Sequence, residues 1–200
     1  MMNCIGGVRM NFILASGSLR RQELIKRMGI DYQVIVSDFD EENVPYDGDP
    51  ESYVKILASE KAKNILNEET SNSFILGVDT IVCAQGKILG KPKDRDDAFS
   101  MMKLMQDNVH EVYSGLALLH ENKGIIETVS RKTSVEFSSM SDEEIHTYLD
   151  KNEWEDKAGA YGIQGAAGVF IKGIEGDFYN VMGLPLNTLY NILKKYQIIM

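Results

Sequence analysis

The residues best suited to chemistry start with a carboxylate that follows an apolar run. Residues 74–78 are small or apolar and lead directly into Asp79. Such a run is typical of a buried strand, so we expect Asp79 to lie where this strand leaves the core, at the edge of a crevice. A turn-capping aspartate is the alternative. Lys91 beyond the next hairpin and the upstream pair Arg20 and Arg21 favour a functional carboxylate.

A second candidate site lies near the N-terminus, where an apolar run, a loop of small residues and a helical pattern follow one another. The loop holds Ser16 and Ser18, and Arg20 and Arg21 fall in the first helical turn. Backbone N–H groups in such a loop can approach an anion. Cations are disfavoured at this end of a helix, and a bound phosphate would relieve the conflict because arginine binds phosphate through two hydrogen bonds. An exposed basic turn without function is the alternative.

Acidic and basic residues also gather in the next part of the chain. Residues 38–42 hold four carboxylates in five positions, and carboxylate oxygens can bind a hard cation. A solvated acidic loop is the alternative that the residues alone favour. A helix is predicted over residues 49–66, and Lys61 lies beside its apolar face, where it could point into a cleft or remain a surface lysine.

Composition limits the class of protein. The chain has 200 residues, is 44% hydrophobic and 26% charged, and carries a formal net charge of -9. This acidic balance disfavours broad nucleic-acid binding, and no apolar run approaches the roughly 18 residues that a membrane helix needs. Cys4 and Cys83 are the only cysteines. We therefore expect no disulfide and a location in the reducing cytoplasm.

The remaining pattern alternates strands and helices. Residues 1–10 are expected to form a disordered extension before one domain over residues 11–200. Two strand-like runs, 109–119 and 125–137, predict a hairpin, and Ser141 with Glu144 predicts a capping box. Further helices are expected from Asp94 and over residues 186–196, with a strand over residues 168–174.

The chain resembles the Maf family of septum-formation-like nucleoside triphosphate pyrophosphatases. The likeness runs from about Phe12 to the C-terminus, and its motifs together are highly specific. They are the segments 14–24 (LASGSLRRQEL), 60–62 (EKA), 77–82 (GVDTIV), 89–92 (LGKP), 156–165 (DKAGAYGIQG), 176–177 (GD) and 183–185 (GLP).

The resemblance implies an α/β fold with a mixed, largely antiparallel-edged twisted sheet, flanking helices and two lobes around a substrate cleft. It also implies metal-dependent cleavage of a nucleoside triphosphate between the α- and β-phosphates, giving a monophosphate and pyrophosphate. Mg²⁺, Mn²⁺ or Co²⁺ would be the cofactor. Asp79 would accept a proton from the attacking water, or only orient that water if a metal lowered its pKa. A homodimer is plausible by resemblance.

The resemblance assigns the other site residues by position. Phosphate binding falls to Ser16, Arg20, Arg21, Lys61 and Lys91, and metal binding to Glu41 with Asp79. Arg20, Thr80 and Gln164 match positions linked to substrate choice in the branch acting on dTTP and UTP. Two residues depart from the family pattern: Leu19 replaces a usual proline, which would pre-set the loop backbone, and Ser59 replaces a common arginine.

Two other functions remain open at this point. One is the related branch that hydrolyses 7-methyl-GTP, which differs at the substrate-choice positions. The other is a cell-division regulator that acts by binding a partner protein, as the septum-formation name suggests.

Overall fold

The computed structural model describes residues 4–5, 8–9 and 11–199. The chain divides into two units. Unit 1 comprises residues 1–79, 114–131 and 183–200, and unit 2 comprises residues 80–113 and 132–182. The disordered extension predicted over residues 1–10 falls largely outside the described residues; within it, β1 (Cys4–Ile5) pairs antiparallel with β2 (Val8–Arg9).

A seven-stranded mixed sheet underlies the fold, in the order β4-β3-β5-β7-β8-β9 with β6 paired to β5. β3 pairs in parallel with β4 and β5, whereas β5–β6 and β8–β9 are antiparallel. The predicted α/β class with a mixed sheet is therefore confirmed. The strands are β3 (Phe12–Leu14), β4 (Gln33–Val34), β5 (Phe74–Ala84), β6 (Lys87–Leu89), β7 (Val109–His120), β8 (Ile125–Phe137) and β9 (Ile171–Glu175).

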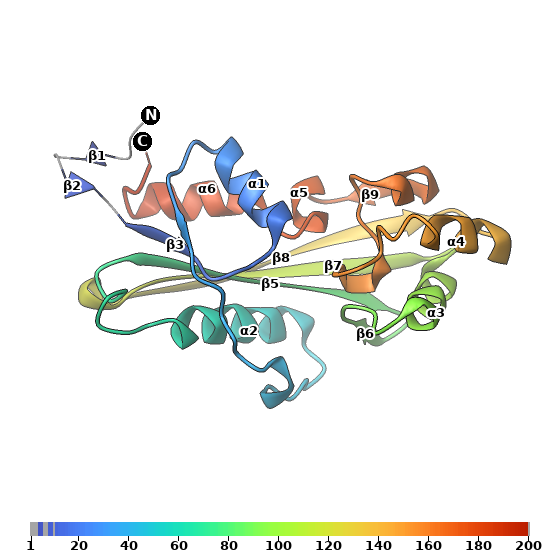
Figure 1. Cartoon of the computed structure of the whole chain (residues 1–200), viewed down its shortest axis with the longest axis horizontal. Helices are drawn as coiled ribbons and strands as arrows, with labels where there is room; N and C mark the ends of the chain where they lie inside the picture. The colour runs from blue at the N-terminus through green and yellow to red at the C-terminus, as the bar shows by residue number, and fades with distance from the viewer. Residues whose placement is uncertain (1–3, 6–7, 10, 200) are drawn as a thin grey trace. The chain divides into compact units, whose positions relative to one another are not determined.

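Three helices cover the sheet in unit 1: α1 (Leu19–Arg27), α2 (Pro50–Asn64) and α6 (Leu186–Lys195). Figure 1 shows α2 on one face and α1 with α6 on the other. The core beneath α2 joins small and branched side chains of α2 to those of the strands, because small residues let a helix approach a sheet closely. Its members are Ile13, Ala15, Ala58, Ala62, Ile65, Ile75, Ala117 and Leu119.

Unit 2 holds α3 (Arg95–Met105), α4 (Asp142–Leu149) and α5 (Phe178–Val181). The predicted capping box of Ser141 and Glu144 opens α4, and Asp94 caps α3 as predicted. The core of this unit packs methionines of α3 against aromatic and aliphatic residues of α4 and the sheet. Among its members are Met101, Met102, Met105, Val135, Phe137, Ile145, Tyr148 and Leu149.

A buried polar pair lies within the unit 2 core. His110 on β7 is 1% exposed, and its Nε2 lies 2.8 Å from the Tyr161 hydroxyl oxygen. Burial lowers the pKa of His110 to about 4 and raises the pKa of Tyr161. Both groups are therefore held neutral inside unit 2.

Two sequence predictions need correction. The prediction that a strand ends at Asp79 is wrong, because β5 continues for five more residues to Ala84. The strand predicted over residues 168–174 begins only at Ile171, after a 3-10 helix over Ala166–Phe170. The hairpin of β7 and β8 is confirmed, joined by a 3-10 turn over Glu121–Lys123. In the described part of the chain, no helix is both long and apolar enough to cross a membrane.

Candidate active site

Asp79 takes part in a chain of charges on unit 1. Its Oδ1 lies 2.5 Å from Lys61 Nζ, which also lies 2.6 Å from Glu41 Oε1. The side chains of Asp79 and Lys61 are 7% and 14% exposed, whereas that of Glu41 is 55% exposed. Lys61 therefore bridges a buried carboxylate and an exposed one. The two carboxylates balance the charge of the Lys61 ammonium group, which is largely shielded from solvent.

Two glycines explain how α2 brings Lys61 to the sheet. A Cβ on Gly77 of β5 would overlap the carbonyl oxygen of Ala58, and one on Gly115 of β7 would overlap that of Val54. Both of these carbonyl groups belong to α2. The helix backbone can therefore lie directly on the strands, and Lys61, three residues after Ala58, reaches the Asp79 carboxylate.

Arg21 ties the small-residue loop to a distant part of the chain. Its Nη1 donates to Ser16 Oγ at 3.0 Å, and its Nε donates to the Gly183 carbonyl oxygen at 2.9 Å. Ser18 caps α1, where its Oγ accepts from Arg21 N–H at 3.5 Å. The guanidinium therefore fixes the hydroxyl of the predicted phosphate loop and the turn before α6 at the same time.

The electrostatics of Arg21 link this loop to the carboxylates. Its pKa is lowered to about 10, chiefly by burial; Asp79 and Glu41 oppose this shift, whereas neighbouring Arg20 adds to it. The side chain keeps its positive charge at neutral pH. Five predicted residues, together with Arg20, thus share one electrostatic environment in unit 1: Ser16, Arg21, Glu41, Lys61 and Asp79.

One oxygen of this site has no hydrogen-bond partner among the described residues. Asp79 Oδ2 is buried, while Oδ1 of the same group binds Lys61. No group of three or more His, Cys, Asp or Glu residues suited to a metal occurs among the described residues. A Mg²⁺-like cation needs only one or two carboxylates when substrate phosphates supply further oxygens. The donor set of Asp79 and Glu41 fits that requirement.

Unit 2 brings together two other predicted motifs. Lys91 Nζ lies 3.5 Å from Asp156 Oδ1, and Gly159 N–H donates to the Gly90 carbonyl oxygen at 3.0 Å. Gly159 has a φ of +68° and packs on Val82 of β5, so a side chain there would be strained. The motifs around residues 90 and 159 are therefore neighbours, with Lys91 exposed on their surface.

The two remaining predicted residues also lie in unit 2. Thr80 directly follows Asp79 along β5 and is half-buried, whereas Gln164 is exposed. The Gln164 Oε1 lies 3.4 Å from where a Cβ on Gly162 would stand. A side chain at residue 162 would therefore stand in ordinary van der Waals contact with this amide.

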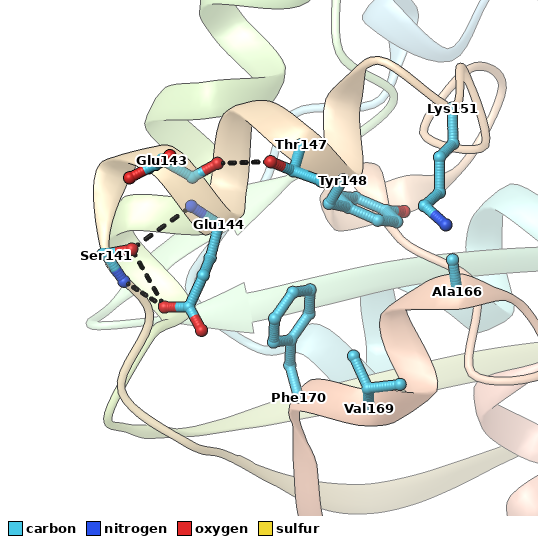
Figure 2. Close-up of a pocket in the computed structure, with 9 residues that line it drawn as sticks. All are labelled: Ser141, Glu143, Glu144, Thr147, Tyr148, Lys151, Ala166, Val169 and Phe170. Carbon is cyan, nitrogen blue, oxygen red and sulfur yellow. Dashed lines mark hydrogen bonds between the residues drawn. The ribbon is translucent and has the colours of Figure 1, made fainter.

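A separate cavity of about 480 Å³ in unit 2 includes none of the predicted residues. Figure 2 shows Tyr148, Val169 and Phe170 along it, with Glu144 bonded to Ser141 in the capping box. The Tyr148 hydroxyl donates to the Ala160 carbonyl oxygen at 3.0 Å. The Tyr148 hydroxyl and the Glu144 carboxylate of this cavity therefore already form hydrogen bonds within the protein.

Residues 11–196 match the family described as Maf-like protein. The chain belongs to the Maf-like family. The dTTP/UTP pyrophosphatase of Clostridium novyi (strain NT) is 51% identical over 183 residues, covering 92% of this chain and 96% of the relative. The dTTP/UTP pyrophosphatase of Clostridium kluyveri (strain NBRC 12016) is 49% identical over 187 residues, with coverage of 92% and 96%.

A more distant likeness concerns the fold of this Maf-like chain alone. The solved structure of the Staphylococcus aureus Ham1 protein superposes with a TM-score of 0.50 at 16% sequence identity. The match covers 93% of this chain and 99% of the Ham1 protein. The arrangement of helices on an open mixed sheet is therefore shared well beyond recognisable sequence similarity.

Sequence reasoning on this Maf-like chain missed three contributors to the site. Gly115 gives α2 its second close contact, and the Gly183 carbonyl oxygen accepts from Arg21. Tyr53 on α2 lies within electrostatic reach of Asp79 and Glu41, which raise its pKa after the larger effect of burial. Gly183 belonged to a family motif to which no role had been assigned. No sequence pattern indicated a role for Gly115 or Tyr53.

Proposed function

We propose that this Maf-like protein is a nucleoside triphosphate pyrophosphatase that hydrolyses dTTP and UTP to the monophosphate and pyrophosphate. The observation that carries the proposal is the bridge from Asp79 through Lys61 to Glu41, in reach of the Arg21 charge. It combines a buried carboxylate with the cations that a triphosphate requires. The names of the relatives that are about half identical supply the choice of substrate.

In the proposed reaction, a water oxygen attacks the α-phosphorus. The bond from that phosphorus to the α–β bridging oxygen breaks, and pyrophosphate leaves with the bonding electrons. Asp79 orients the water and takes its proton, because a carboxylate beside the reacting oxygen is a general base. Lys61 holds the Asp79 carboxylate in place through the 2.5 Å contact between Lys61 Nζ and Asp79 Oδ1.

The other charged groups hold the phosphates. Ser16, Arg20 and Arg21 are proposed to bind them at the loop before α1. Lys61 and Lys91 are proposed as further phosphate-binding cations. A divalent cation such as Mg²⁺, Mn²⁺ or Co²⁺, held by Glu41 and Asp79, would supply further neutralisation of the triphosphate charge. Thr80 and Gln164 are proposed to select the base, since an amide can both donate to and accept from a base edge.

A nucleotide panel tests the proposal. Purified protein is incubated with dTTP, UTP, CTP, ATP, GTP and 7-methyl-GTP, each with Mg²⁺, Mn²⁺ or Co²⁺, and products are resolved by chromatography. Preferred release of pyrophosphate from dTTP and UTP is the expected result. Inactivity on every triphosphate with all three metals would refute the enzyme, and a preference for 7-methyl-GTP would move it to the other branch.

The proposal includes the setting of the enzyme. Its proposed location is the cytoplasm, where its nucleotide substrates occur. Nucleic acid is not proposed as a partner, because a chain of net charge -9 repels the phosphate backbone. A homodimer is the proposed assembly. Light scattering at micromolar concentration measures the assembly directly, and a monomer mass would remove that part of the proposal.

A further inference from the structure

The acidic segment 37–46 lies against α2 at three separate points. At its start, the Asn64 Oδ1 accepts from the Ser37 hydroxyl at 2.9 Å and from the Asp38 N–H at 3.2 Å. In its middle, Glu41 pairs with Lys61 at 2.6 Å. At its end, the Tyr46 ring meets Tyr53 edge to face, with centroids 5.3 Å apart and planes at 71°.

The middle of this segment is open to solvent. Residues 40–43 are all exposed, and the 3-10 turn Glu41–Asn43 that carries Glu41 buries none of its residues. Glu42 N–H and Val44 N–H bond within the segment itself, to Asp40 and Glu41. A short exposed turn loses considerable conformational entropy when it is ordered, and its contacts with α2 contribute free energy that compensates for this loss.

Tyr53 both packs against this segment and lies within electrostatic reach of the carboxylates of the site. Tyr53 is half-buried on α2, and its ring contacts the ring of Tyr46. Burial raises the pKa of its hydroxyl, and the charges of Asp79 and Glu41 raise it further. The phenol therefore stays neutral and adds no charge to the environment that the two carboxylates share.

We propose that Tyr53 and Asn64 are positioning residues that hold segment 37–46 on α2, so that the Glu41 carboxylate stays beside Lys61. This inference rests on the proposed function for its catalytic consequence, but the positioning itself is a property of unit 1. Removing either residue frees one end of the segment while Lys61, Asp79 and Glu41 all remain. Catalysis then falls because Glu41 is misplaced.

Hydrogen–deuterium exchange tests the positioning without any substrate. In Tyr53→Ala and Asn64→Ala, amides of residues 38–44 are expected to exchange about tenfold faster than in the wild type. Tyr53→Phe keeps the ring and should exchange like the wild type. Tyr190→Ala is the matched control, because Tyr190 is a partly exposed tyrosine on α6. Unchanged exchange in both alanine variants, under conditions where they are folded, would overturn the proposal.

A double-mutant cycle then tests the link to Glu41. Tyr53→Ala is expected to lower kcat at least tenfold in the wild-type background and to have almost no effect in Glu41→Gln, since its effect acts through that carboxylate. Additive losses, or an equal loss in Tyr53→Phe with normal exchange, would overturn the positioning role. If the wild type hydrolyses no triphosphate, the proposed function fails while the exchange result still decides the positioning.

Discussion

Lys61 Nζ contacts Asp79 Oδ1 at 2.5 Å, and both side chains are largely shielded from solvent. The lysine is the counter-charge that allows a carboxylate to lie within a strand of the core. The same ammonium group reaches Glu41 on the exposed turn. The same atoms therefore form a structural ion pair and the centre of the proposed active site. Substitutions of Asp79 and Lys61 should accordingly differ in how much they change stability and how much they change activity.

Replacing Asp79 by Asn should abolish hydrolysis while the fold persists. The amide keeps the size of the carboxylate but cannot accept the proton of the attacking water, so kcat should fall by about 10²–10⁴. Steady-state pyrophosphate release measures the loss, with Asp31→Asn, an exposed carboxylate, as the control. If a cell-division effect survived in Asp79→Asn without hydrolysis, protein binding and not catalysis would carry it.

Replacing Lys61 by Met should destabilise the protein. The substitution leaves the buried Asp79 carboxylate without its cation, and breaking such a pair costs about 3 kcal/mol of unfolding free energy. Urea titration at pH 7 measures it. Lys63→Met removes an exposed pair with Glu60 on the same helix and should cost less than about 1 kcal/mol. Equal losses in the two variants would contradict the role assigned to burial.

Replacing Gly77 by Ala should push α2 away from β5. The new methyl group would meet the Ala58 carbonyl oxygen and the Ala62 Cβ, and overpacking of this kind costs about 1–3 kcal/mol. Activity should fall as well, because Lys61 moves with the helix. Gly173→Ala on β9 is the control, since nothing lies within 4 Å of its added Cβ. Wild-type stability in Gly77→Ala would refute the close approach.

His110 should make the stability of the protein depend on pH. Its pKa is about 4 in the folded state and about 6.5 when unfolded, so the unfolded chain binds more protons between these values. Stability from this group is complete above pH 6.5 and falls by about 3 kcal/mol as the pH drops to 4.

Urea midpoints measured from pH 7 to pH 4 check this dependence. His110→Gln can still hydrogen-bond Tyr161 but cannot titrate, so its stability should vary less with pH than that of the wild type. The control is His146→Gln on the exposed side of α4. A wild-type pH slope in His110→Gln would show that other groups cause the dependence.

Replacing Leu19 by Pro should stabilise the protein by about 0.5 kcal/mol. Leu19 is the first residue of α1, where the N–H has no intrahelical acceptor and proline fits. The preceding Ser18 has an extended ψ of 115°, which a following proline requires. Thermal unfolding measures the gain, with Leu19→Ala showing the effect of losing the exposed leucine. Destabilisation by proline would mean that the loop backbone differs from this geometry.

The sequence by itself determined the local elements and the family. Caps such as Asp49 and Asp94 and the Ser141–Glu144 box act within one turn, so residue type and spacing are sufficient to place α2, α3 and α4. Motifs that recur in one order likewise identify the family without any coordinates. The candidate residues followed from those motifs, with their roles remaining proposals.

Only the tertiary structure decided which groups meet. The unbroken passage of β5 through Asp79 could not be predicted, because a charge in an apolar run indicates a strand end unless a partner from another element neutralises it. That partner, Lys61, is 18 residues away along the chain. The contacts of Arg21 with Gly183 and of Tyr46 with Tyr53 likewise depend on how α1, α2 and the sheet pack. Non-local packing leaves no periodic signal in a single sequence, and for this reason it had to be seen in three dimensions.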